Sequence, residues 1–191
     1  MFRNNITFKG ICTIILFVTM GVSQVSITIE NINANAGTLD IIMTNQAGCS
    51  SCDDSSFDNK IGCEVSGNNT AGGVWTFDTS IDETTCEAWD GDDGINGVYF
   101  DGEVGGFQFE LLGLTLSDAT APDEFLISVG GNLLIGFSMT GATIPSGIGV
   151  LLTQVTFSDF EEAEICFGED TGSSGANAVS DSNGGYIAAN W

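Results

Sequence analysis

The stretch Val104-Gly-Gly-Phe-Gln-Phe-Glu-Leu111 has the clearest strand pattern of this chain. Phe107, Phe109 and Leu111 are two residues apart, so in an extended strand they point to one face, and the polar residues between them point to the other. This alternation is typical of a strand with one face buried and one face in water. We therefore expect Phe107, Phe109 and Leu111 to form a core stripe.

The same pattern recurs along the chain, between turns rich in Gly, Asn, Asp and Ser. The predicted strands are residues 25–29, 38–44, 106–116, 125–129, 133–140, 149–158, 163–167 and 185–191. This number and spacing of strands predict an all-β fold, a two-sheet antiparallel β-sandwich of jelly-roll-like type. Residues 46–103, rich in Cys, Asp, Asn and Gly, break the pattern. We interpret them as an insertion with its own small disulfide-held structure.

Three pieces of the chain resemble one family. They are Gly37-Thr-Leu-Asp-Ile-Ile-Met-Thr-Asn45, the Val104 to Leu111 stretch, and Leu134-Ile-Gly-Phe-Ser-Met-Thr-Gly-Ala-Thr-Ile-Pro-Ser-Gly-Ile-Gly-Val-Leu-Leu152. In this order they resemble the cohesin-type modules of secreted and surface proteins, which are similar to carbohydrate-binding β-sandwiches. The resemblance covers residues 25–45 and 104–191, with the Cys-rich segment between the first two pieces. It implies a cohesin-like sandwich, a fold that hosts scaffolding, adhesion and sugar binding alike.

The composition excludes several classes of function. The 191 residues include no histidine, so neither a Ser-His-Asp triad nor a histidine-ligated metal site can form. Only 3 Lys and Arg stand against 26 Asp and Glu, which gives a formal net charge of −23. Because binding of phosphates requires Lys and Arg, we expect no nucleic-acid partner. We also expect no enzymatic activity.

The amino terminus predicts export. Arg3 and Lys9 precede an apolar run over residues 11–22 that ends in small and polar residues, the order found in secretory signal peptides. The run of about 12 residues is shorter than the roughly 20 needed to cross a bilayer. We interpret residues 1–24 as a signal peptide cleaved near Ser23 or Gln24, with an uncleaved membrane anchor as the alternative. The mature domain, residues 25–191, is then secreted or at the cell surface, without a membrane span.

The cysteines predict disulfides. Loss of Cys12 with the signal peptide leaves five, an odd number, so one thiol is expected to be spare. The segment from Cys63 to Cys86 resembles the small "C…GG.W…C" loops of secreted proteins, and this resemblance implies a Cys63–Cys86 bridge. For Cys49, Cys52 and Cys166 the pairing stays open: Cys49 and Cys52 bridge each other, or one of them bridges Cys166.

An acidic loop near the end of the insertion is a candidate calcium site. Counted from Asp92, it has Asp at position 1, Asn at 5, Gly at 6 and Glu at 12, as in known calcium loops. Position 3 is Gly94, which offers no side-chain oxygen, so other carboxylates would have to substitute. The full candidate ligand set is Asp90, Asp92, Asp93, Asn96, Asp101 and Glu103. The alternative is a pair of Asp-Gly turns on an acidic surface.

Two further candidate sites lie in the insertion. Asn68-Asn69-Thr70 is an acceptor pattern for N-glycosylation at Asn68. Trp75 and Trp89 are candidates for a flat platform that stacks on a sugar.

Together these features favour a secreted, non-enzymatic binding or assembly module that acts in adhesion, scaffolding or an extracellular matrix. The expected partner is an extracellular protein or polysaccharide. One alternative is a carbohydrate-binding module that uses Ca²⁺. Another is self-assembly into filaments by strand exchange through the strand at residues 25–29.

Overall fold

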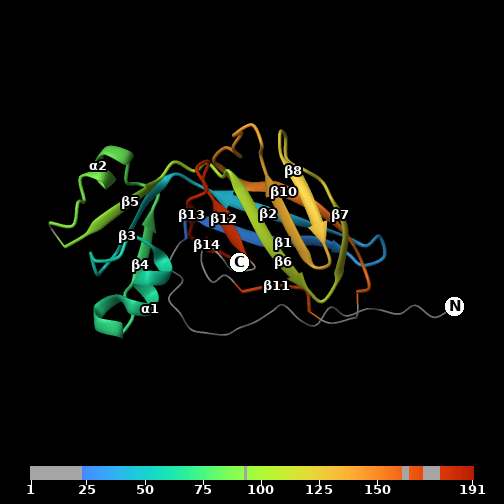
Figure 1. Cartoon of the computed structure of the whole chain (residues 1–191), viewed down its shortest axis with the longest axis horizontal. Helices are drawn as coiled ribbons and strands as arrows, with labels where there is room; N and C mark the ends of the chain where they lie inside the picture. The colour runs from blue at the N-terminus through green and yellow to red at the C-terminus, as the bar shows by residue number, and fades with distance from the viewer. Residues whose placement is uncertain (1–22, 93, 161–163, 170–176) are drawn as a thin grey trace.

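The computed structural model of the chain describes residues 23–92, 94–160, 164–169 and 177–191. Most of the described elements are strands, so the predicted β-rich fold is confirmed. The strands form three sheets (Figure 1). None of the helices in these ranges is long and apolar enough to cross a membrane.

The first sheet has five strands in the order β14-β1-β2-β10-β7. Their bounds are Val25–Asn33 (β1), Thr38–Asn45 (β2), Thr115–Ala119 (β7), Gly147–Ser158 (β10) and Ala189–Asn190 (β14). All neighbours are antiparallel except β1 and β14, which are parallel over Val25 and Ser26. Strand β2 buries every second residue, as its apolar alternation requires.

The second sheet has the order β13-β12-β6-β9-β8, with β11 beside β6. Its strands are Gly106–Leu112 (β6), Leu126–Gly130 (β8), Leu133–Phe137 (β9), Cys166–Phe167 (β11), Ala178–Ser180 (β12) and Tyr186–Ile187 (β13). Figure 1 shows β6, β8 and β12 in front of β1 and β2. Strand β12 was not predicted from the sequence, because three residues are too short for an alternation to be visible.

Both sheets contribute to one hydrophobic core. Leu39, Ile41 and Met43 of β2 and Phe109 and Leu111 of β6 are all fully buried members of the same cluster. The rings of Phe107 and Phe109 stack with centroids 6.1 Å apart. The predicted core stripe of β6 is therefore confirmed, since Phe107 is 3% exposed and the other two are 0% exposed.

The single strand predicted over residues 106–116 is wrong, because the chain turns at Gly113. Strand β6 ends at Leu112 in the second sheet, and β7 begins at Thr115 in the first sheet. Gly113 has φ +90°, and a Cβ there would collide with the backbone oxygen of Glu164. Glycine permits this sharp change of direction and this close approach.

The inserted segment forms a third sheet with the order β4-β3-β5. Its elements are β3 (Gly48–Cys52), α1 (Lys60–Thr70), β4 (Trp75–Asp78), α2 (Glu83–Glu87) and β5 (Asn96–Phe100). Figure 1 shows this part at the left-hand end of the molecule, with α1 and α2 on either side of the three strands. A second small core of Cys52, Cys63 and Trp75 lies beneath Phe57 and Val98.

The all-β prediction is wrong for the insertion, which contains the two short helices. Each begins at a polar capping residue: the side chain of Asn59 accepts from the N–H of Gly62, and that of Asp82 accepts from the N–H of Thr85. Neither helix is long enough to show a repeating apolar face. Local capping and disulfides hold them instead, which is why helical periodicity did not reveal them.

Candidate functional site

Two disulfides fix the insertion, and neither is the predicted one. Cys49 bonds Cys86 with a Cα–Cα distance of 5.5 Å, and Cys52 bonds Cys63 with a distance of 5.8 Å. The predicted Cys63–Cys86 bridge is therefore wrong. Cys49 and Cys52 are three residues apart in β3, so their side chains point to opposite faces of the sheet and cannot reach each other. One disulfide ties α2 to one face of the small sheet, and the other ties α1 to the opposite face.

Cys166 is also disulfide-bonded. The predicted bridge between Cys166 and Cys49 or Cys52 is wrong, because both of those are paired elsewhere. The spare thiol that we predicted is not found among the described cysteines.

The structure does not bring the candidate calcium ligands together into one loop. Asp90 and Asn96 form an isolated β-bridge at the start of β5, and the N–H of Asp92 donates to Asp90 Oδ1 at 3.1 Å. Asp101 and Glu103 lie beyond the other end of β5. A strand of five residues separates the two ends by roughly 16 Å, at about 3.3 Å per residue. Asp93 lies outside the described residues.

The carboxylate of Glu103 accepts a hydrogen bond from Thr143 Oγ1 at 2.7 Å. Among the described residues, one group of Cys, Asp or Glu side chains lies close enough together to share a metal ion, namely Cys52, Asp53 and Cys63. Its two sulfurs are joined in the disulfide, so it offers no thiolates. Calcium binding therefore stays a prediction. The described candidate ligands around β5 do not surround a common point at which one ion could bind.

The two candidate tryptophans differ in accessibility. Trp75 is 3% exposed within the small core, so its ring cannot stack on a sugar while the insertion is folded. Trp89 is half-buried. Asn68 is exposed and adopts a left-handed conformation with φ 51°, and its N–H donates to Asp54 Oδ2 at 2.8 Å. The glycosylation prediction at Asn68 is thus compatible with the accessibility of its side chain.

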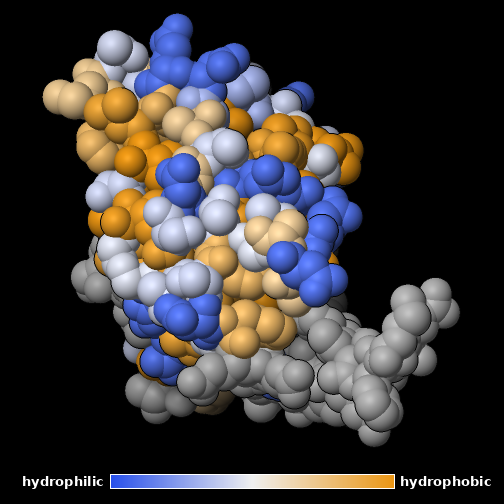
Figure 2. Space-filling view, turned by 90° about the vertical axis from the view of Figure 1, so that its right-hand side faces the viewer, coloured by the Kyte–Doolittle hydropathy of each residue, from blue (hydrophilic) through white to orange (hydrophobic). Residues whose placement is uncertain are grey.

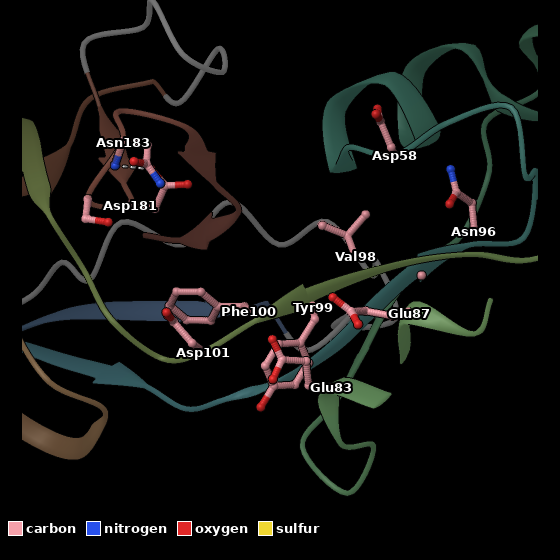
Figure 3. A pocket seen from close by; sticks show the side chains of 12 residues that line it. Asp58, Glu83, Glu87, Asn96, Val98, Tyr99, Phe100, Asp101, Asp181 and Asn183 are labelled. Carbon is pink, nitrogen blue, oxygen red and sulfur yellow. Dashed lines mark hydrogen bonds between the residues drawn. The ribbon is translucent and has the colours of Figure 1, made fainter. Parts of the chain in front are cut away.

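A pocket of about 530 Å³ lies along β5, and we call it the β5 groove (Figure 3). It is lined by residues 96–101, by Asp58, Glu83 and Glu87, and by the turn of Asp181, Ser182 and Asn183 that connects β12 to β13. Figure 3 shows Asp58, Asn96 and Val98 on one side of the β5 ribbon and Tyr99 and Glu83 on the other. The groove therefore joins the insertion to the second sheet and follows the strand rather than one of its faces.

Capping residues position the acidic side chains of this groove. Asp82 begins α2 and so places Glu83 and Glu87 beside β5. A hydrogen bond from the backbone N–H of Thr85 lowers the pKa of the Asp82 carboxyl below its ordinary value of 3.8. On the other side, Asp181 accepts from the N–H of Asn183 at 2.7 Å, which fixes the turn across the groove.

A second surface differs sharply from the acidic remainder of the protein. The 34 consecutive residues from Phe125 to Ser158 include no charged side chain. On the outer face of β8 and β9 in this run, Leu126 is 50% exposed and Phe137 is 40% exposed, and they lie opposite each other in the ladder. Leu133 and Ile135 of β9 continue the face and are half-buried. We call these four residues the β8–β9 apolar face.

Figure 2 shows the side of the molecule at the right of Figure 1, where hydrophobic surface gathers in two areas separated by hydrophilic residues. The charge-free run is visible in the sequence. The exposed apolar face was nevertheless not predicted, because apolar side chains in strands are usually assigned to the core. Only the pairing of the strands reveals which of them face outward.

The apolar face and the groove are connected across the second sheet. Phe137 lies opposite Gly106 of β6, and Gly106 lies opposite Ser180 of β12, the residue before Asp181. At about 4.8 Å per strand, Leu126 and Ser180 are roughly 14 Å apart. One molecular surface therefore passes from apolar residues through small residues to carboxylates.

Comparison with protein-family models and with curated proteins finds no match to this chain.

Proposed function

We propose that this protein is an extracellular, non-enzymatic binding or assembly module built on a cohesin-like β-sandwich. In this proposal the first and second sheets are the two layers of the sandwich, and the insertion is carried at one end. The shared core of the two sheets supports this arrangement. The two disulfides of the insertion are typical of proteins that fold in an oxidising compartment.

The β8–β9 apolar face supports a protein as the binding partner. Leu126 and Phe137 expose large apolar side chains on a strand pair without a single charge, in a chain of formal charge −23. Covering one such side chain contributes about 1 to 2 kcal/mol, since apolar burial is worth about 25 cal/mol per Å². Aromatic and aliphatic anchors surrounded by polar residues are the usual centre of protein interfaces.

The partner is expected to carry basic residues around its apolar anchor. Asp123 and Glu124 precede β8, and Asp181 lies at the far end of the row described above. Carboxylates at both ends favour a partner with Lys or Arg, because opposite charges speed association and exclude acidic competitors. This arrangement favours a protein partner over a neutral polysaccharide. The ring of Trp75 is buried and therefore cannot stack on a polysaccharide either.

Site-specific photocrosslinking tests the proposal. A photoreactive phenylalanine analogue at Phe137 keeps the aromatic shape, and the same analogue at Thr156, exposed on β10 of the first sheet, is the matched control. We expect illumination in the native extracellular medium to give an adduct of one defined mass from position 137 and none from 156. Equal labelling from both positions, or no adduct from either, would contradict protein binding at this face.

A glycan array tests the alternative of carbohydrate binding. Saturable glycan binding that is lost in Trp89→Ala would favour the carbohydrate-binding module and would replace the proposal. A Trp75→Ala variant is not informative here, because it removes a buried core residue.

A further inference from the structure

The β5 groove follows the edge of a strand. Six consecutive residues, 96–101, line it. Because successive side chains of a strand point to opposite faces, a groove that touches all of them must run along the backbone edge. Strand β5 is at the end of the β4-β3-β5 sheet, with β3 as its partner on one side.

The backbone of Tyr99 faces this edge without a partner. The N–H of Gly97 donates to the oxygen of Trp89 at 2.9 Å, on the side of β5 that faces away from β3. Alternate residues of a strand direct their backbone groups the same way, so the N–H and C=O of Tyr99 also face away from β3. In the part of the chain that the structure describes, neither group has a hydrogen-bond partner. The free edge therefore begins after Gly97, where the cover by Trp89 and Asp90 ends.

Carboxylates surround this edge on both faces. Asp58 lies on the face of Val98, and Glu83 and Glu87 lie on the side of α2. Lys60 is the one Lys or Arg within the described ranges, and it does not line the groove. Its Nζ donates to Ser23 Oγ at 3.3 Å and to Asn190 Oδ1 at 3.0 Å instead. The negative charge of the groove thus has no internal counterpart.

We propose that the β5 groove binds an extended, lysine- or arginine-bearing peptide segment of a partner protein, which adds as a fourth strand to the β4-β3-β5 sheet. The peptide backbone bonds to the N–H and C=O of Tyr99, as in other cases of strand addition. Its alternate side chains reach the two faces, where Asp58 on one side and Glu83 and Glu87 on the other receive the cationic groups. This site is separate from the β8–β9 apolar face and adds a second point of recognition.

The test uses the full protein and a fluorescein-labelled peptide in which pairs of lysines alternate with pairs of valines, so that lysines reach both faces of the added strand. Its control peptide has the same sequence with N-methylated backbone amides, so it keeps the charge but cannot pair as a strand. We expect saturable anisotropy changes with the first peptide and at least about tenfold weaker binding of the second. Hydrogen exchange should show protection of the Tyr99 and Asp101 amides when the first peptide is bound.

Matched protein variants separate the groove from general attraction to an acidic protein. Glu83→Gln with Glu87→Gln removes two charges from the groove, and Asp118→Asn with Glu124→Gln removes two exposed charges elsewhere. At about 0.5 kcal/mol for each exposed ion pair, the groove variant should lose about fivefold in affinity, and the control variant less than about twofold.

The inference is overturned by equal binding of the two peptides, by equal loss of affinity in the two double variants, or by no protection of the Tyr99 amide. Binding of Ca²⁺ or spermine at the groove without binding of the peptide would overturn it as well. Since Phe137 plays no part in this assay, the result is independent of the photocrosslinking test of the proposed function.

Discussion

Removal of each disulfide of the insertion should destabilise the protein by an amount set by the length of the loop that it closes. The Cys49–Cys86 bond joins residues 37 apart, and the Cys52–Cys63 bond joins residues 11 apart. In the chain-entropy description, these separations correspond to about 3.8 and about 2.8 kcal/mol of stabilisation at 25 °C. We therefore expect the Cys49→Ala, Cys86→Ala variant to be less stable than the Cys52→Ala, Cys63→Ala variant by about 1 kcal/mol.

The assay is urea unfolding followed by tryptophan fluorescence, with thermal unfolding as a second measurement. Trp75 lies in the small core of the insertion and Trp191 contacts Phe109 in the main core, so the two report on different parts. For a domain of this size, 1 kcal/mol corresponds to about 2 to 4 °C in Tm. Ser51→Ala, on the same strand as both cysteines, is a control that should change little.

The reasoning is refuted if the order of the two variants is reversed, or if both match the wild-type protein. Peptide mapping without reduction checks the premise directly. It should find Cys49 linked to Cys86 and Cys52 linked to Cys63, and a Cys63–Cys86 peptide would contradict the structure.

Three other predictions concern stability. Asn45→Ala should cost about 2 to 3 kcal/mol in urea unfolding, because the fully buried Asn45 amide donates to three backbone carbonyls, at 2.6, 3.0 and 3.5 Å, that would lose this partner. An unchanged midpoint would show that water replaces the amide. Asp82→Asn should lower the midpoint at about pH 6, and the difference from the wild-type protein should shrink as the pH falls below 3.8. The folded-state pKa of Asp82 is depressed, so the contribution of its carboxylate to the free energy of unfolding is present above the ordinary pKa of 3.8 and is lost as the pH falls through the folded-state pKa. A difference in midpoint between the two proteins that persists in acid would contradict this prediction. A chain that starts at Val25 should be about 1 to 3 kcal/mol less stable than one that starts at Ser23. The shorter chain loses two hydrogen bonds, because Gln24 Oε1 accepts from the N–H of Ala188 at 3.0 Å and Ser23 Oγ accepts from Lys60 Nζ. Equal melting temperatures of the two chains would refute this prediction.

The sequence alone determined most strands of the two larger sheets and the core stripe of β6, because these depend on neighbours two residues apart. Phe107, Phe109 and Leu111 alternate with polar residues, and the structure buries all three. The acidic balance and the absence of histidine also follow from composition, and they limit the chemistry without any knowledge of the fold.

The disulfide pairing and the two candidate surfaces depend on how the sheets are arranged in space. A cysteine pairs with whichever partner the sheet brings within about 6 Å, and β3 directs Cys49 and Cys52 to opposite faces. Likewise, the loop from Asp92 to Glu103 has the spacing of a calcium site, but five of its residues extend as β5 and separate its ends. Local spacing cannot reveal this outcome, because β5 pairs with β3 through residues that are 44 to 52 positions apart, from Asn96 opposite Cys52 to Phe100 opposite Gly48.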